Sequence, residues 1–409
     1  MINLTQRGLL AVTLYWCVSL TYAQQNNDTG YLPPIISILL DETQCPIKAE
    51  TTIVGDQFIS SQEDVDALAS TTKIDGSLTI VNETVQTLDF SPLDSLIEVT
   101  GSVQHGDSSS ESEVLMAING FNCLTTVGKN LRIEFSESLV SISGFSALTR
   151  VGGRLTILNN DSLTTIPDFS SLAVVGGDLN IFSNESLTGI SGFSALSAVG
   201  GSLNLSQNDS LEHISGFSRL SSVEGFLGVW SNDLLNRTPE FSALTSVGGS
   251  LIVSSNDPLE SISGFSALTS VGGALSLSRN DSLTDISGFS ALAVVEGTFE
   301  IGENASLVSI PDFSALNFVG GNLDISFNDS LTSVASFSEL TSVGGNLTIS
   351  FNIALTNISG FQMLSSSEET GDSRIESNPL LDCSNPIPNF VPVLASSGNQ
   401  TDCMVTTIM

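Results

Sequence analysis

The sequence predicts an all-β fold, a parallel β-helix or β-solenoid of about a dozen 24-residue rungs with capped ends. Three rows of residues predict it, because an apolar strand pair, a phenylalanine and an asparagine each recur with this period. Such a period is typical of a solenoid, in which each unit buries its apolar face against its neighbours. The phenylalanine row consists of Phe121, Phe145, Phe169, Phe193, Phe217, Phe241, Phe265, Phe289, Phe313, Phe337 and Phe361.

One unit, residues 265–288, indicates how each rung is built. Leu275 and Leu277 are separated by one residue, which predicts a strand with both side chains on one face. Gly272 and Gly273 precede this strand and predict a tight turn with positive φ. The spacings Phe-x-x-Leu-x-x-Val and Leu-x-x-Ile are too short for packed helices and predict arcs or short strands at the corners. Because stacked strands lie about 4.8 Å apart, the rungs predict a rod or shallow arc of roughly 60 Å.

The asparagine row predicts a buried ladder at the point where the chain turns after each strand. An asparagine amide donates and accepts at once, so stacked amides can satisfy backbone groups of the turns above and below. The ladder consists of Asn160, Asn184, Asn208, Asn232, Asn256, Asn280, Asn304, Asn328 and Asn352. Six of these residues also satisfy the N-x-Ser/Thr rule, but burial in a ladder would keep glycans off them.

The glycosylation candidates are therefore sequons outside the ladder. They are Asn27, Asn82, Asn204, Asn346, Asn357 and Asn399. Asn204 and Asn346 fall in or beside the outward face of a predicted strand. A further sequon at Asn236 is disfavoured by Pro239, which follows it closely.

The two ends of the chain predict a secreted, extracellular protein. Arg7, the apolar run over 9–20 and the small-residue site over 21–23 are typical of a cleavable signal peptide. We expect no transmembrane segment and no GPI signal, and association with a cell wall or cell surface stays open. The predicted organisation is a signal peptide over 1–23, a flexible N-terminal segment over 24–44, an N-terminal cap with irregular rungs over 45–120, regular 24-residue repeats over 121–364, and a C-terminal cap and tail over 365–409.

Four cysteines outside the predicted signal peptide favour disulfide bonds in an oxidising compartment. Cys45, Cys123, Cys383 and Cys403 all lie towards the ends of the chain, and they allow three pairings. An extended solenoid places Cys45 and Cys383 far beyond the ~7 Å Cα separation that a disulfide tolerates. Local pairs are therefore expected, Cys383–Cys403 at one end and, if the chain folds back, Cys45–Cys123 at the other.

Charge and composition exclude several classes of function. The chain has 44 acidic and 11 basic residues and a formal charge of −33, which excludes a basic face for nucleic acid or for an anionic membrane. The two histidines, His105 and His213, occupy unrelated positions and are expected on loops or on the surface. No metal-ligand spacing and no nucleotide-binding motif is present. We therefore expect no catalytic, cofactor-binding or metal-binding residues.

The motif Val-Gly-Gly-x-Leu-x-Ile-x-x-Asn-x-x-Leu-x-x-Ile resembles the receptor L-domain family, as in insulin- and EGF-receptor ectodomains. The segments 51–53, 60–68 and 74–80 are similar to fungal GPI-anchored cell-wall glycoproteins built on L-domains. The resemblance covers residues 45–383, and it implies leucine-rich-repeat-like, right-handed rungs. It also implies a role in binding peptides or in wall organisation. Residues 70–73 depart from the family pattern, because they lack a cysteine that is often found there.

The expected function is that of a non-catalytic extracellular binding or cell-wall structural glycoprotein, with a protein or glycan ligand of unknown identity. A polysaccharide-active β-helix enzyme is the main alternative. Glu300 and Asp324 occupy outward strand positions on adjacent rungs, roughly 5 Å apart, which is the separation of a retaining carboxylate pair.

Two further alternatives concern rows of polar residues. An acidic row beside the ladder could bind cations weakly, Ca²⁺ in particular. Alternatively, its carboxylates are simply exposed to solvent along one edge of the solenoid. The acidic row consists of Asp161, Glu185, Asp209, Asp233, Asp257, Asp281 and Asp329. A hydroxyl row could instead bind ice, although Ala173, Ala293 and Asn317 interrupt it. That row consists of Thr149, Ser197, Ser221, Thr245, Thr269 and Thr341.

Overall fold

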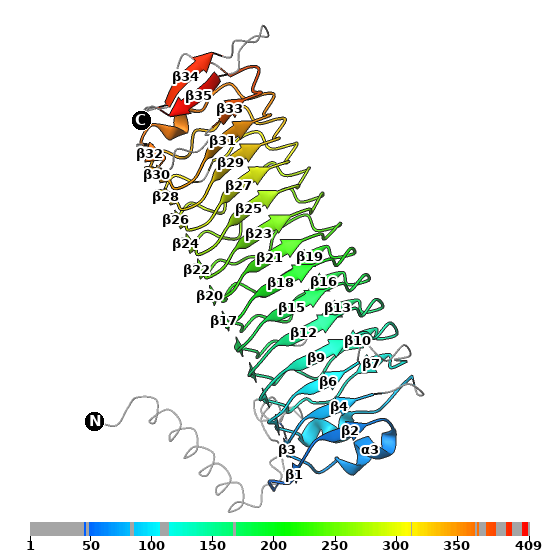
Figure 1. Ribbon diagram of the computed structural model, residues 1–409. Helices are drawn as coiled ribbons and strands as arrows, with labels where there is room; N and C mark the ends of the chain where they lie inside the picture. The colour runs from blue at the N-terminus through cyan, green and yellow to red at the C-terminus, as the bar shows by residue number, and fades with distance from the viewer. Residues whose placement is uncertain are drawn as a thin grey trace, which may run out of the picture. The chain divides into compact units, whose positions relative to one another are not determined.

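The computed structural model confirms an all-β solenoid of stacked parallel rungs (Figure 1). The structure describes residues 45, 49–81, 86–106, 114–166, 169–311, 313–364, 366–367, 374–381, 390–394 and 403–407. Contacts divide the chain into two units, Met1–Pro46 and Ile47–Met409. The solenoid belongs to the second unit.

Sheet A is a 14-stranded parallel sheet of short strands that end on buried valines in most rungs. Its strands, in order, are β1 (Thr52–Val54), β3 (Lys73–Asp75), β5 (Glu98–Val99), β8 (Thr126–Val127), β11 (Arg150–Val151), β14 (Val174–Val175), β17 (Ala198–Val199), β20 (Ser222–Val223), β22 (Ser246–Val247), β24 (Ser270–Val271), β26 (Val294–Val295), β28 (Phe318–Val319), β30 (Ser342–Val343) and β32 (Ser366–Ser367). Each regular strand pairs with the residues 24 positions away, so the sequence period is the register.

Sheet B is also 14-stranded and parallel, and it contains the predicted Leu-x-Leu strands. Its strands are β2 (Gln57–Ile59), β4 (Leu78–Ile80), β6 (Val103–His105), β9 (Leu131–Glu134), β12 (Leu155–Leu158), β15 (Leu179–Phe182), β18 (Leu203–Ser206), β21 (Leu227–Trp230), β23 (Leu251–Ser254), β25 (Leu275–Ser278), β27 (Phe299–Gly302), β29 (Leu323–Ser326), β31 (Leu347–Ser350) and β33 (Arg374–Glu376). Both sheets run without interruption through residue 121, where the sequence predicts the change from irregular to regular rungs. The irregular rungs therefore share one stack with the regular ones.

The third side of each rung is formed by shorter pairings. Sheet C has five strands, β7 (Ala117–Ile118), β10 (Ser141–Ile142), β13 (Thr165–Ile166), β16 (Gly189–Ile190) and β19 (His213–Ile214). Beyond it, isolated parallel bridges continue the same side, as between Ser261 and Asp285. The predicted Leu-x-x-Ile corner is thus a short strand in some rungs and a single bridge in others.

A few elements depart from the parallel stack. The helix α3 (Gln62–Ala67) follows β2, and Ser61 caps it by accepting from the backbone N–H of Asp64. A hydrogen bond from the backbone of Ser60, with others from the Ser61 and Ser60 hydroxyls, holds the pKa of Asp64 below its usual value. Two 3₁₀ turns, η1 (Ser91–Ser95) and η2 (Ser359–Phe361), lie at corners. The strands β34 (Phe390–Leu394) and β35 (Cys403–Thr407) form an antiparallel pair.

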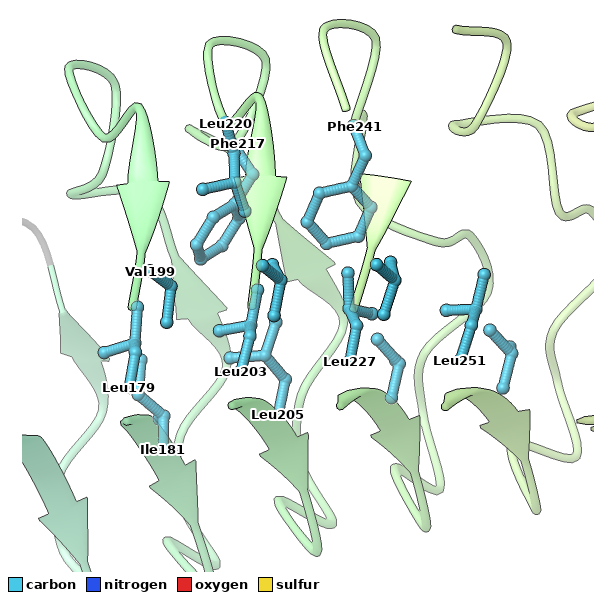
Figure 2. Packing of buried hydrophobic residues seen from close by; sticks show 14 of the residues in the cluster. Leu179, Ile181, Val199, Leu203, Leu205, Phe217, Leu220, Leu227, Phe241 and Leu251 are labelled. Carbon is cyan, nitrogen blue, oxygen red and sulfur yellow. The ribbon is translucent and has the colours of Figure 1, made fainter. Parts of the chain in front are cut away.

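The core is a set of stacked side-chain columns that run through the interior of the rungs (Figure 2). Consecutive rings of the phenylalanine row have centroids 5.2 to 5.6 Å apart, and most are nearly parallel. Phe90, which lies outside the 24-residue period, extends the column at 5.9 Å from Phe121. Since Phe241 is fully buried, truncation there removes contacts on both sides of the stack.

The predicted reason for the Gly-Gly pairs is wrong. Neither Gly272 nor Gly273 has a positive φ, and the first glycine of the pair is needed for close approach. A Cβ on Gly272 would lie 2.3 Å from the carbonyl oxygen of Gly248 in the preceding rung. The left-handed conformation instead falls on the residue before each ladder asparagine, for example Ser255 with φ 54° and Arg279 with φ 57°.

Candidate functional site

The ladder asparagines are fully buried and connect consecutive rungs from Asn160 to Asn352. The backbone N–H of Asn256 donates to Oδ1 of Asn280 (3.1 Å), and its Nδ2 donates to the carbonyl oxygens of Val229 (3.0 Å) and Ser254 (3.0 Å). The same pattern repeats along the row. The ladder therefore uses the amide nitrogens of these residues inside the stack, including those of the six ladder sequons, while Oδ1 of Asn160 at the first step is buried without a partner.

Sequence reasoning missed both ends of this ladder. Asn378 adds a further step, because Asn352 N–H donates to its Oδ1 (3.0 Å), but the intervening insertion lengthens the spacing to 26 residues. At the other end Ser136 occupies the asparagine position, and its Oγ lies 3.1 Å from Nε2 of His105.

The expectation of a surface or loop position is wrong for His105. Its side chain is 1% exposed and faces inward in β6, in register with Ile80 and Ile133. Burial lowers the pKa of His105 to about 4, so the neutral imidazole is the folded form. An alignment of Val-Gln-His on the Leu-x-Ile pairs would have indicated this position. His213 is exposed, with Nε2 3.8 Å from a carboxylate oxygen of Glu212.

The glycosylation candidates lie in different surroundings. Asn204 is half-buried in β18, and its Oδ1 is inaccessible and has no hydrogen-bond partner. Asn346 precedes β31, and its backbone N–H donates to Oδ1 of Asn322 (2.9 Å). Asn357 is exposed and accepts from the backbone N–H of Ser359 (2.8 Å). The other three, Asn27, Asn82 and Asn399, lie outside the described residues.

The structure shows the oxidation state of two of the four cysteines. Cys45 and Cys123 are both disulfide-bonded. Cys383 lies outside the described residues, and Cys403 is the first residue of β35. The pairing of Cys383 with Cys403 stays a prediction.

The carboxylate pair of the enzyme hypothesis does lie on adjacent strands. Glu300 in β27 and Asp324 in β29 are partners in the parallel register. The hydroxyl of Ser276 donates to Oε2 of Glu300 (2.9 Å), while Oδ1 of Asp324 is inaccessible and unpartnered. Both carboxyl groups therefore project from one face of one sheet, with hydroxyl neighbours.

The acidic and hydroxyl rows differ in how their side chains are used. All members of the acidic row are exposed except Asp161, which is half-buried. Among the described residues, no three His, Cys, Asp or Glu side chains converge as a metal site. The hydroxyls of the other row each donate to a carbonyl oxygen of the preceding rung, as Thr269 does to Thr245 (3.0 Å). Their donors are therefore already used within the stack.

One cavity of about 270 Å³ lies near the first rungs, away from the carboxylate pair. Its lining includes Glu50, Thr72 and the ion pair between Lys73 and Glu98 (2.9 Å). The hydrogen bond that Lys73 donates to the Glu98 carboxylate raises the pKa of Lys73. Both charges of this pair are already neutralised within the protein.

Sequence reasoning also missed an uncharged stretch on the outward face of sheet B. The six consecutive strands from β12 to β25 contain no charged residue. Trp230 and Phe182 project from this face and are half-buried, and the ring of Phe226 lies 5.9 Å from that of Trp230. Gly228 could have indicated this stretch from the sequence, because a glycine inside a strand often marks a site where another group approaches the backbone closely.

No protein-family model matches the chain, and no curated protein or solved structure shows significant similarity to it. The family stays open. The resemblance to receptor L-domains therefore remains a hypothesis about a chain whose solenoid fold is established. In the part of the chain that the structure describes, no helix combines the length and apolar character needed to cross a membrane.

Proposed function

We propose that this protein is a secreted solenoid glycoprotein of the receptor L-domain kind that binds an extracellular protein or glycan, or builds an extracellular surface, without catalysis. The observation that carries the proposal is the outward face of sheet B, which presents 14 parallel strands in register. Phenylalanine and asparagine columns tie this face to the interior at each regular rung. A preorganised face of this kind loses little conformational entropy on binding.

Two observations support an extracellular location. Cys45 and Cys123 are disulfide-bonded, and disulfide bonds persist mainly in oxidising compartments. The segment 1–23 has the composition of a signal peptide. A formal charge of −33 also favours a soluble particle that repels other anions.

Catalysis is the second candidate, because Glu300 and Asp324 lie on neighbouring strands. Retaining glycosidases place two carboxyl groups on either side of the scissile bond, about 5–5.5 Å apart. Here both groups point away from the same sheet, and Ser276 bonds to one of them. This arrangement favours a polar surface over an acid and nucleophile that face each other across a sugar.

A binding screen and an activity screen test the proposal together. We expect the purified chain to retain specific members of a glycan array or of a set of secreted proteins, and to leave a polysaccharide panel unhydrolysed. Glu300→Gln and Asp324→Asn should retain the binding of the parent. Turnover of a polysaccharide that either substitution abolishes would establish the enzyme instead.

A further inference from the structure

The outward face of β12 to β25 differs chemically from the rest of this acidic molecule. Its outward positions are Thr156, Leu158, Asn180, Phe182, Asn204, Ser206, Gly228, Trp230, Ile252, Ser254, Ser276 and Ser278. Charges return on the neighbouring strands, with Arg132 and Glu134 on β9 and Glu300 on β27, and at strand ends, where Arg154 pairs with Asp178 and Arg279 with Glu303. Amides, hydroxyls, two aromatic rings and the aliphatic Leu158 and Ile252 thus cover six rungs, or roughly 25 Å of the stack.

The indole of Trp230 lies over the backbone of its own strand. A Cβ built on Gly228 would be 1.8 Å from Cζ3 and 2.4 Å from Cε3 of the indole. Only glycine leaves room for this placement, in which the six-membered ring covers the Gly228 Cα. Because the side chain is half-buried, part of the indole remains available for stacking.

The groups around the indole are uncharged, and they combine hydrogen-bonding side chains with the apolar Ile252 and Phe226. Ser206 and Ser254 are its register partners on the two neighbouring strands, and Asn204 is the partner of Gly228. Asn204 Oδ1 has no partner within the protein. This oxygen is also closed to solvent, so a ligand can reach Asn204 only through its amide nitrogen.

The spacing of the rings also points to a repeating ligand. Phe182 on β15 and Trp230 on β21 are two rungs apart, about 10 Å along the stack, with the small Ser206 between them. A protein partner generally needs a contiguous apolar core with aromatic anchors, whereas here Ser206 separates Phe182 and its neighbour Leu158 from Trp230 and Ile252. Two separated rings flanked by amides and hydroxyls fit a chain that alternates apolar faces with hydroxyl groups.

We propose that the outward face of β12 to β25 binds a neutral oligosaccharide segment, with one sugar ring stacked on Trp230 and its hydroxyls bonded to Asn204 and the flanking serines. The proposal deepens the proposed function and rests on it. The electron-rich indole face attracts the C–H groups of a sugar ring. Charged sugars are disfavoured, because a face without Lys or Arg offers no counter-charge and the surrounding molecule is strongly anionic.

The sequence provides a direct probe of this site. Its two tryptophans are Trp16 and Trp230, so Trp16→Phe in the full chain leaves the Trp230 indole as the only one. We expect that titration with neutral hexasaccharides (laminarihexaose, cellohexaose or mannohexaose) shifts or quenches its emission for at least one sugar. Hexagalacturonate, an anionic hexasaccharide, should have no effect.

Three variants separate the site from the rest of the molecule. Trp230→Ala should weaken the binding of that sugar, measured by calorimetry, by at least about tenfold. Gly228→Val should weaken it similarly with the tryptophan retained, because the new side chain displaces the indole. Phe327→Ala is the matched control, since it removes a half-exposed ring that is stacked on Phe351 at 4.7 Å elsewhere on the molecule. Circular dichroism confirms that each variant is folded.

Each contrary outcome has a distinct meaning. Equal binding of the sugar by Trp230→Ala overturns this proposal and leaves the proposed function standing. Equal affinity for hexagalacturonate, or no binding of any neutral hexasaccharide, also overturns it. If Trp230→Ala abolishes only the capture of a secreted protein, then the occupant of this face is a protein and the proposal is wrong. The proposed function itself fails if the parent chain hydrolyses a polysaccharide.

Discussion

At the residue scale, each ladder asparagine hydrogen-bonds the turns of neighbouring rungs to one another. Asn256 donates through its amide to two backbone carbonyls and accepts from the backbone N–H of Asn232. These groups are fully buried, so each would be unsatisfied without the amide. The ladder thus fixes the register at the corner that follows sheet B.

We therefore expect Asn256→Ala to lower the free energy of unfolding by about 1–3 kcal/mol, because it leaves buried backbone groups unpaired. Urea denaturation followed by circular dichroism measures the change. Asn317→Ala is the control: the side chain of Asn317 is exposed, and the change should stay within about 0.5 kcal/mol. Equal effects at the two positions would contradict the ladder.

The residues with positive φ before each ladder asparagine allow a substitution that should raise the free energy of unfolding. Ser255 has φ 54°, a conformation that costs a residue with a Cβ about 1–2 kcal/mol more than glycine. Ser255→Gly should stabilise the fold by up to about 1 kcal/mol, after the greater freedom of glycine in the unfolded chain is subtracted. Ser266→Gly is the control, because Ser266 does not have positive φ, and this change should destabilise the protein. Thermal unfolding measures both changes. A lower melting temperature for Ser255→Gly than for Ser266→Gly would contradict the positive φ of Ser255.

His105 predicts a pH dependence with a defined sign. The folded pKa is about 4, below the unfolded value of 6.5, so between these pH values the unfolded chain binds more protons. Stability is retained above about pH 6.5 and is lost as the pH falls towards 4. Relative to His105→Gln, the parent should lose about 2 kcal/mol between neutral pH and about pH 5. A constant difference between the two proteins would show that His105 is solvated.

At the element scale, the strands of sheet B follow directly from the sequence, whereas the segments that form sheet A were expected as either arcs or short strands. The apolar pairs predict the sheet B strands, and the 24-residue period is their register. The third side was harder to predict, because it varies from strands to single bridges under one Leu-x-x-Ile spacing. The role of glycines such as Gly272 was predicted wrongly. Close approach between turns and a positive φ both favour glycine, so the sequence alone does not distinguish the two reasons.

The phenylalanine column gives the corresponding prediction for packing. Phe241 lies 5.6 Å from Phe217 and 5.2 Å from Phe265 and is fully buried. Phe241→Ala should therefore destabilise the protein by about 3–5 kcal/mol in urea denaturation. Phe327→Ala removes a ring that is 51% exposed and should cost less than about 1 kcal/mol. Similar losses for both variants would contradict a continuous buried column.

At the scale of the whole molecule, the repeat predicts the architecture more completely than it predicts the site. Strand register and buried columns depend on periodicity, and periodicity is visible in a single sequence. The proposed binding face depends on departures from periodicity, such as Gly228 beside Trp230, and these gain meaning only when the strands are placed side by side. The same limit applies to Asn378, which is in the ladder but out of period.

The outward face of β12 to β25 is the proposed neutral binding surface of this acidic molecule. Hydroxyl-radical footprinting of the full chain, with and without the neutral hexasaccharide that it binds, tests this claim most directly. We predict that Trp230 and Phe182 are protected from oxidation in the complex, while Phe327 and Phe351 react as they do in the free protein. Protection of Phe327 and Phe351 with Trp230 unchanged would place the ligand elsewhere and contradict the claim.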